Sequence, residues 1–160
     1  MVNKTSKIIY TVFSWLAVFA TMAIIARFSL QNSNDSSSTS EAFLELIPFH
    51  DKLSAQALGV IHTIIRKLAH FTVYALLGIV AYNAYSISIR IKRGFLYLIS
   101  VGFASTYAFI DEFVYQAISP GRAPMLLDVL IDTLGASFGA LLMLLTIFII
   151  KLIKNKETSL

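Results

Sequence analysis

Four long apolar runs constrain this chain more than any other feature of its sequence. They cover residues 8–28, 67–87, 94–116 and 126–150, and none contains proline. Each is long enough to cross about 30 Å of hydrocarbon as a helix. A segment inside a bilayer must pair its own backbone polar groups, which a helix does. The runs therefore predict an all-α, polytopic membrane protein with four transmembrane helices, forming a single domain over residues 1–160.

The composition agrees with a membrane protein and excludes several functional classes. Hydrophobic residues make up 57% of the chain and charged residues 14%, with a mean hydropathy of +0.74. A soluble domain of this length would need far more surface charge. The net charge is +4, but the cations lie at the ends of apolar runs, so no nucleic-acid partner is expected. The absence of cysteine excludes disulfides, thiolate metal ligands and cysteine nucleophiles.

The positions of the cations predict the orientation of the spans. Four spans place both termini on one side, and eight of the 13 Lys and Arg residues then share that side. The positive-inside bias assigns it to the cytoplasm. The first run follows two lysines, as in a signal peptide, but it is too long and lacks a small-residue cleavage site. We interpret it as a retained anchor in the bacterial cytoplasmic membrane, with both termini inside.

The segment between the first two runs, residues 29–66, is predicted to be an outer loop. It begins with the Ser-rich stretch SLQNSNDSSSTSE, which is typical of a flexible connection. Its last part, LSAQALGVIHTIIR, places apolar residues on one helical face. Two interpretations stay open for that part, namely a helix lying on the membrane surface or a plain helical extension of the second span.

Ionisable residues from three spans are expected at one depth near the outer end of the bundle. A helix rises about 1.5 Å per residue, so His70 lies roughly 6 Å below the surface if the second span begins near Arg66. The third span ends near Gln116 and the fourth begins near Leu126, which brings four acids to a similar level. The resulting polar layer comprises Arg66, Lys67, His70, Asp111, Glu112, Asp128 and Asp132.

Helical spacing predicts how side chains of this polar layer are arranged. Arg66, His70 and Tyr74 recur every four residues and share one face of the second span. On the third span, Tyr115 and Gln116 follow the two acids by one turn. Tyr74, Tyr115 and Gln116 are accordingly further candidate site residues.

The fourth span combines an acidic face with a small-residue face. Asp128 and Asp132 continue along the helix into Gly135 and Gly139, where another helix can pack closely. The acids are therefore expected to point into the bundle. The turn SPGRAP should hold Arg122 over the same polar layer.

Several chemistries fit this polar layer. Arg66, Lys67 and Arg122 could clamp a phosphate or carboxylate, because guanidinium groups grip oxyanions at two points. His70 and the acids could act as an acid–base pair or hold a divalent cation, although no metal-binding motif is present. The candidate catalytic residues are His70, Asp111, Glu112, Asp128 and Asp132. An ion-coupled transporter is disfavoured because the acids are shallow and the spans lack paired Gly/Pro breaks.

A set of short motifs in the same region resembles the VanZ-like family. They are FSLQ (28–31), RKLAHFTVYALLG (66–78), IDEFVYQ (110–116), PGR (120–122) and DVLIDTLGASFG (128–139), in the family's order. The resemblance implies a four-span membrane protein and, for the founding member, resistance to the lipid-tailed glycopeptide teicoplanin. It marks as signature residues Lys67, His70, Tyr74, Asp111, Glu112, Gln116, Arg122, Asp128, Asp132 and Gly135.

Three functions are compatible with the sequence. The leading hypothesis is a cell-envelope protein that binds an anionic lipid-linked headgroup or wall precursor on the extracytoplasmic side and affects teicoplanin susceptibility. The first alternative is a membrane enzyme acting on a lipid phosphate. The second is a structural protein that binds a copy of itself or another envelope protein, in which the polar layer only holds the helices in register. Intramembrane ionisable groups usually mark functional sites, which favours the first two.

Overall fold

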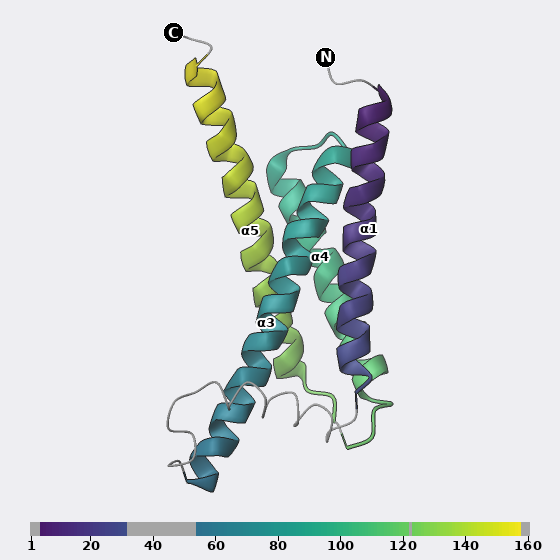
Figure 1. Ribbon diagram of the computed structural model, residues 1–160, viewed down its shortest axis with the longest axis vertical. Helices are drawn as coiled ribbons and strands as arrows, with labels where there is room; N and C mark the ends of the chain where they lie inside the picture. Colours follow the sequence, from purple (N-terminus) through teal and green to yellow (C-terminus); the bar gives the residue numbers. More distant parts are fainter. Residues whose placement is uncertain (1–3, 32–53, 122, 158–160) are drawn as a thin grey trace.

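Four long helices and one short π-helix make up the part of the chain that the structure describes (Figure 1). The computed structural model describes residues 4–31, 54–121 and 123–157. Its elements are α1 (Lys4–Ser29), α3 (Ala55–Ser88), α4 (Arg93–Ile110), the π-helix η2 (Asp111–Gln116) and α5 (Leu126–Glu157). Within these ranges four helical segments are long and apolar enough to cross a membrane, with η2 continuing α4. For the described residues, the prediction of an all-α chain with four helices able to span a membrane is confirmed.

Helix α3 begins at Ala55, well before the second span predicted at 67–87. The hydroxyl of Ser54 caps it by accepting a hydrogen bond from the N–H of Ala57 at 3.2 Å. No proline follows to stop the helix, so it continues unbroken into the bundle. Of the two interpretations left open for LSAQALGVIHTIIR, the structure has the helical extension of the second span. Residues 32–53 of the predicted outer loop lie outside the described residues.

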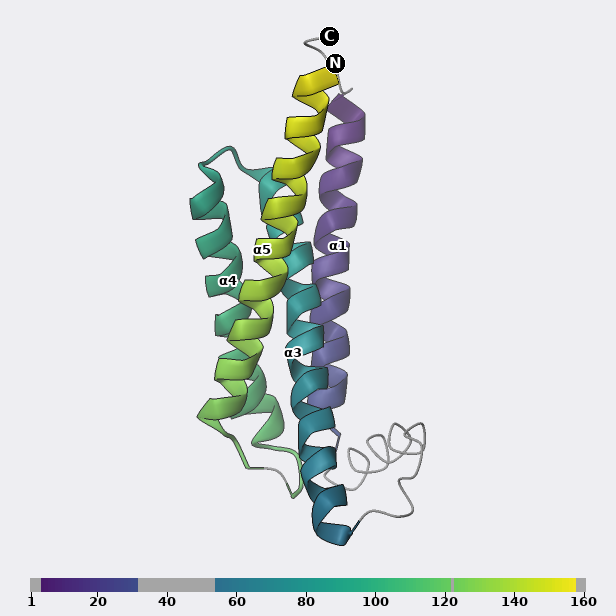
Figure 2. The same ribbon diagram turned by 90° about the vertical axis from the view of Figure 1, so that its left-hand side faces the viewer.

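Helix α3 is the centre of the bundle and contacts each of the other long helices. Its most extensive interface is with α5, while α1 packs against α3 and η2, and α4 against α3 and α5 (Figures 1 and 2). Buried apolar residues from all four helices form one cluster, including Val18, Leu77, Ala104 and Ala136. This cluster fixes the positions from which the polar side chains reach one another.

Glycines allow α3 and α5 to approach closely. A Cβ atom at Gly135 would collide with the carbonyl oxygen of Phe71, and one at Gly139 with that of Ala75. Gly78 of α3 faces the backbone of Ala136 in the same way. The two glycines that the sequence assigns to a helix contact thus lie directly against the α3 backbone.

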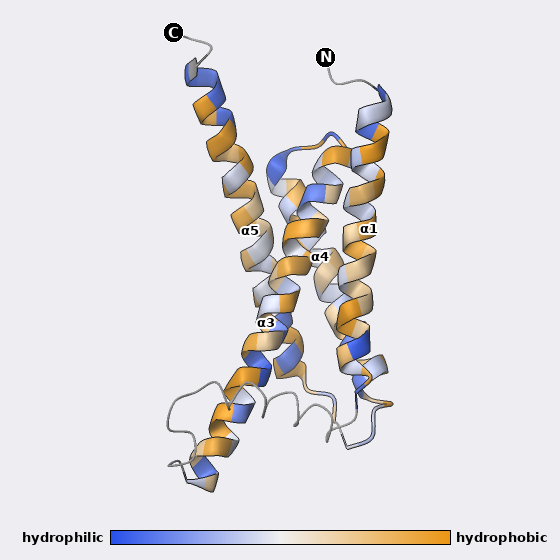
Figure 3. Cartoon of the chain, in the orientation of Figure 1, coloured by the Kyte–Doolittle hydropathy of each residue, from blue (hydrophilic) through white to orange (hydrophobic). Residues whose placement is uncertain are grey.

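The two ends of the bundle differ in which elements meet there. The start of α1, the end of α5 and the α3–α4 connection lie at one end, and η2 and the starts of α3 and α5 lie towards the other (Figures 1 and 2). Near that other end, hydrophilic residues interrupt the apolar surface of α3 and α5 (Figure 3). This is where the predicted polar layer lies.

Candidate functional site

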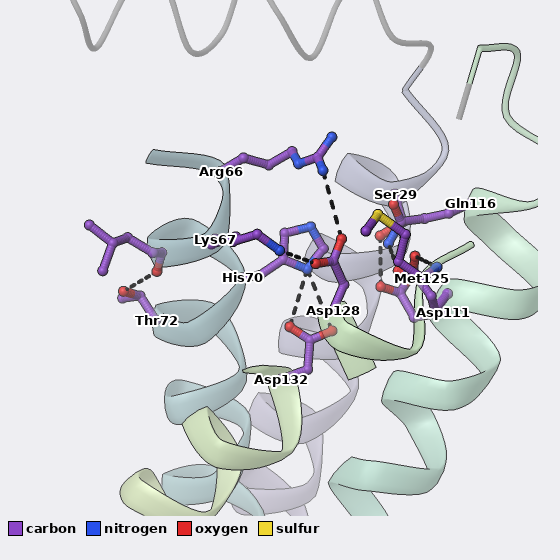
Figure 4. A network of polar contacts seen from close by, with 12 residues as sticks. Ser29, Arg66, Lys67, His70, Thr72, Asp111, Gln116, Met125, Asp128 and Asp132 are labelled. Atoms are coloured by element: carbon purple, nitrogen blue, oxygen red, sulfur yellow. Dashed lines mark hydrogen bonds and ion pairs between the residues drawn. The ribbon is translucent and has the colours of Figure 1, made fainter. Parts of the chain in front are cut away.

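Two cations of α3 reach a single carboxylate of α5. Nζ of Lys67 lies 2.7 Å from Oδ1 of Asp128, and Nη2 of Arg66 lies 3.8 Å from Oδ2 of the same residue (Figure 4). The Asp128 side chain is 6% exposed, whereas those of Arg66 and Lys67 are 42% and 27% exposed. Asp128 is thus a buried anion shared by two accessible cations.

A second pair lies one helical turn deeper. Nδ1 of His70 is 3.2 Å from Oδ1 of Asp132, whose side chain is fully buried (Figure 4). Both α3 and α5 run away from this end of the bundle, so a step of three residues on α3 and four on α5 leads from Lys67 and Asp128 to His70 and Asp132. The parallel register of the two helices therefore stacks the pairs in depth.

Asp111 extends the polar layer to α1. Its Oδ2 accepts a buried hydrogen bond from Oγ of Ser29 at 2.9 Å, and Oγ of Ser119 donates to the carbonyl oxygen of Ser29 at 2.9 Å. The side chain of Tyr74 lies buried beside Asp111. Within the described residues, however, the Tyr74 hydroxyl and Oδ1 of Asp111 have no hydrogen-bond partner of ordinary geometry. The two groups can satisfy one another, because the Tyr74 hydroxyl can donate and the Asp111 carboxylate can accept.

Glu112 has a different environment. Its Oε1 accepts a hydrogen bond from the backbone N–H of Met125 at 2.7 Å, and its Oε2 accepts one from the side-chain amide of Gln116. The contact with Met125 holds the residue before α5 against η2, and the contact with Gln116 lies within η2 itself. Glu112 and Gln116, which were predicted as site residues, therefore have a structural role in this packing.

The acids of the third span belong to a π-helix rather than to the regular helix that the sequence predicts. The α-helical pattern of α4 ends at Ile110, and η2 covers Asp111–Gln116. π-Helical turns are rare and occur frequently at functional sites. In η2 the three polar residues Asp111, Glu112 and Gln116 are all buried within the bundle.

Two predicted site residues remain, Tyr115 and Arg122. Tyr115 is partly buried and packs edge-on against Tyr107, with ring centroids 6.4 Å apart, so its ring serves the aromatic packing. Arg122 lies outside the described residues. In the described parts of the chain, no group of three or more His, Asp and Glu side chains is placed to hold a metal ion.

Three members of the polar network were not predicted from the sequence. Ser29 and Ser119 contribute hydroxyls, and Met125 contributes a backbone N–H. The sequence offered one signal for Ser29, because it lies in the FSLQ motif. Ser119 begins the SPGRAP turn, but that turn drew attention only to its arginine.

Fold and site together define a class, namely a four-span membrane protein with cation–carboxylate pairs stacked at one end of its helices. A family model described as VanZ/LLP1 matches residues 13–149, and the chain belongs to this family. The match includes every residue of the polar layer. Neither a curated protein nor a solved structure matches the chain.

Proposed function

We propose that the protein binds the anionic headgroup of a membrane lipid at the Arg66–Lys67 rim of the polar layer. The observation that carries this proposal is that two accessible cations share one buried carboxylate. Asp128 can neutralise only one of them, so the rim has a positive charge to offer. Phosphate oxygens are the acceptors that guanidinium and ammonium groups bind best.

The contacts of Arg66 support this assignment. Its 3.8 Å separation from Asp128 is long for an ion pair, and its side chain is 42% exposed. Lys67 stays 2.7 Å from the buried carboxylate, so the accessible guanidinium can turn towards a ligand without leaving Asp128 unpaired. Lys67 would contact the same phosphate from the next position of α3, and Arg122 is proposed as a third cation.

The ligand follows from the proposed orientation. With both termini in the cytoplasm, the polar layer faces the extracytoplasmic side, where lipid-linked wall precursors are used. An undecaprenyl phosphate or a related precursor in a bacterial envelope fits a site at this depth. Binding of such a lipid would also alter susceptibility to teicoplanin, in keeping with the sequence resemblance described above.

Native mass spectrometry of the gently delipidated protein tests the proposal. The wild type should retain a phosphate-bearing lipid, and Arg66→Ala should reduce the retained fraction about tenfold, since a hydrogen bond to a charged group contributes roughly 1.5 kcal/mol. Arg27→Ala is the matched control, because Arg27 is an exposed cation near the end of α1 and outside the polar layer. Equal retention by the two variants would contradict the proposal and leave the layer a structural lattice.

The second candidate, an enzyme acting on a lipid phosphate, is favoured by one contact. The buried pair of His70 and Asp132 lies directly below the rim, where an acid–base group would need to be. In this case the purified protein should hydrolyse a lipid pyrophosphate, and His70→Ala should abolish turnover while lipid retention persists. Retention without turnover in the wild type would exclude the enzyme and keep the binding protein.

A further inference from the structure

The end of the bundle opposite the polar layer carries a large excess of positive charge. Its cations are Lys4, Lys7, Arg90, Lys92, Arg93, Lys151, Lys154 and Lys156. The sequence places one acidic residue, Glu157, in the same segments. The cations of the α3–α4 connection lie together where α3 ends and α4 begins (Figure 3).

A groove of about 940 Å³ opens at this end between α3, α4 and α5. Arg90, Lys92 and Arg93 line it, together with apolar side chains from α4 and α5. Among the apolar residues, Phe95 is 59% exposed, and Ile147 forms the wall on α5. The groove thus has cations at its mouth and apolar walls that continue the lipid-facing surface.

Within residues 4–31, 54–121 and 123–157, no carboxylate forms an ion pair with Arg90, Lys92 or Arg93. The N-terminus of α4 adds to the positive potential, because Lys92 is its N-cap residue and no side chain caps the helix. Lys151, one turn after Ile147 on α5, adds a further exposed cation beside the groove.

We propose that this groove binds one anionic glycerophospholipid from the leaflet at this end of the bundle. The phosphate would lie among Arg90, Lys92 and Arg93, and an acyl chain would follow Phe95 and Ile147 into the hydrocarbon. Basic pockets between transmembrane helices bind anionic headgroups in this way. The apolar walls favour an intact lipid over a soluble anion. This site is separate from the headgroup site proposed at Arg66 and does not depend on it.

The test uses the full chain in detergent, titrated with phosphatidylglycerol or phosphatidylcholine and observed by native mass spectrometry. One phosphatidylglycerol should bind at least tenfold more tightly than phosphatidylcholine. Arg90→Gln/Arg93→Gln should remove this preference. Lys4→Gln/Lys7→Gln removes the same charge from the same end but not from the groove, and it should retain the preference.

Three results would overturn the proposal. An equal loss in both double variants would indicate diffuse attraction by net charge rather than a groove site. Equal affinity for the two lipids would show that the cations do not discriminate between an anionic and a zwitterionic headgroup. Displacement of the lipid by an equal concentration of glycerol phosphate would indicate a site for soluble anions. Arg66→Ala should leave the groove lipid bound, so failure here and failure of the headgroup proposal can be told apart.

Discussion

Asp128 competes with any anionic ligand for the cations of the rim. Its carboxylate lies 2.7 Å from Lys67 and 3.8 Å from Arg66, so a bound phosphate must take over part of these interactions. Asp128→Asn keeps the shape of the side chain but removes its charge. If the rim binds an anionic headgroup, this substitution should increase lipid affinity, opposite in sign to Arg66→Ala.

The expected increase is about tenfold, which corresponds to roughly 1.4 kcal/mol and is near the value of one charged hydrogen bond. Lipid titration observed by native mass spectrometry measures it, with thermal unfolding as a check that the variant is folded. A decrease in affinity would show that Asp128 belongs to the ligand cradle, for instance through a bridging cation, and that the rim does not bind anions by itself.

At the scale of single residues, the sequence predicted which ionisable groups gather but not every partner. Helical spacing and depth placed Lys67, His70 and Asp132 in one layer, because regular helices make depth a simple count. The hydroxyl of Ser29 could not be selected in the same way. It is one serine in a Ser-rich stretch, and its contact with Asp111 depends on how α1 leans against η2.

At the scale of elements, the interface of α3 and α5 rests on glycine. Gly139→Ala would place a methyl group against the carbonyl oxygen of Ala75, which forces the helices apart. We expect a loss of stability of about 1–3 kcal/mol, the usual cost of overpacking. Thermal unfolding followed by the fluorescence of Trp15, the one tryptophan of the chain, measures it.

Gly102→Ala provides the matched control for this substitution. Gly102 is also inside a helix, but no other atom lies within 4 Å of where its Cβ would be. Alanine there should be neutral or stabilise α4 by up to about 1 kcal/mol, because of its higher helix propensity. Equal effects of the two substitutions would mean that the close approach of α3 and α5 does not determine stability.

At this scale the sequence left one feature undecided and missed another. The start of α3 at Ala55 is one of the two possibilities left open for residues 55–66, because apolar spacing alone does not distinguish a surface helix from an extension of the span. The π-helix at Asp111–Gln116 has no pattern of its own in the sequence. It changes the helical register within one turn, and the contact of Glu112 with the backbone N–H of Met125 holds it against the start of α5.

At the scale of the whole molecule, the orientation in the membrane can be tested without altering a native cysteine, because the chain has none. Gly59→Cys places a thiol on the early part of α3, and Ile91→Cys places one in the exposed α3–α4 connection. With cytoplasmic termini, a membrane-impermeant maleimide should label Gly59→Cys in intact cells. It should label Ile91→Cys only after the membrane is permeabilised.

The opposite labelling pattern would reverse the orientation. The Arg66–Lys67 rim would then face the cytoplasm. The argument for wall precursors as ligands would fail, because it depends on the extracytoplasmic side. The lipid groove at Arg90 and Arg93 would in that case meet the outer leaflet. The two sites are on opposite ends of the bundle in either orientation, since the fold alone determines their separation.

The length of α3 has a mechanical consequence. Its 34 residues form a rod of about 51 Å, which exceeds the roughly 30 Å of hydrocarbon that it must cross. The rod has no proline hinge between Ser54 and the turn that bears Lys67 and His70. A movement of the first turns of α3 would therefore also move Lys67 and His70, because no proline hinge lies between them. The first turns of α3 thus form a lever arm that continues, without a proline, into the residues that contact the carboxylates of α5.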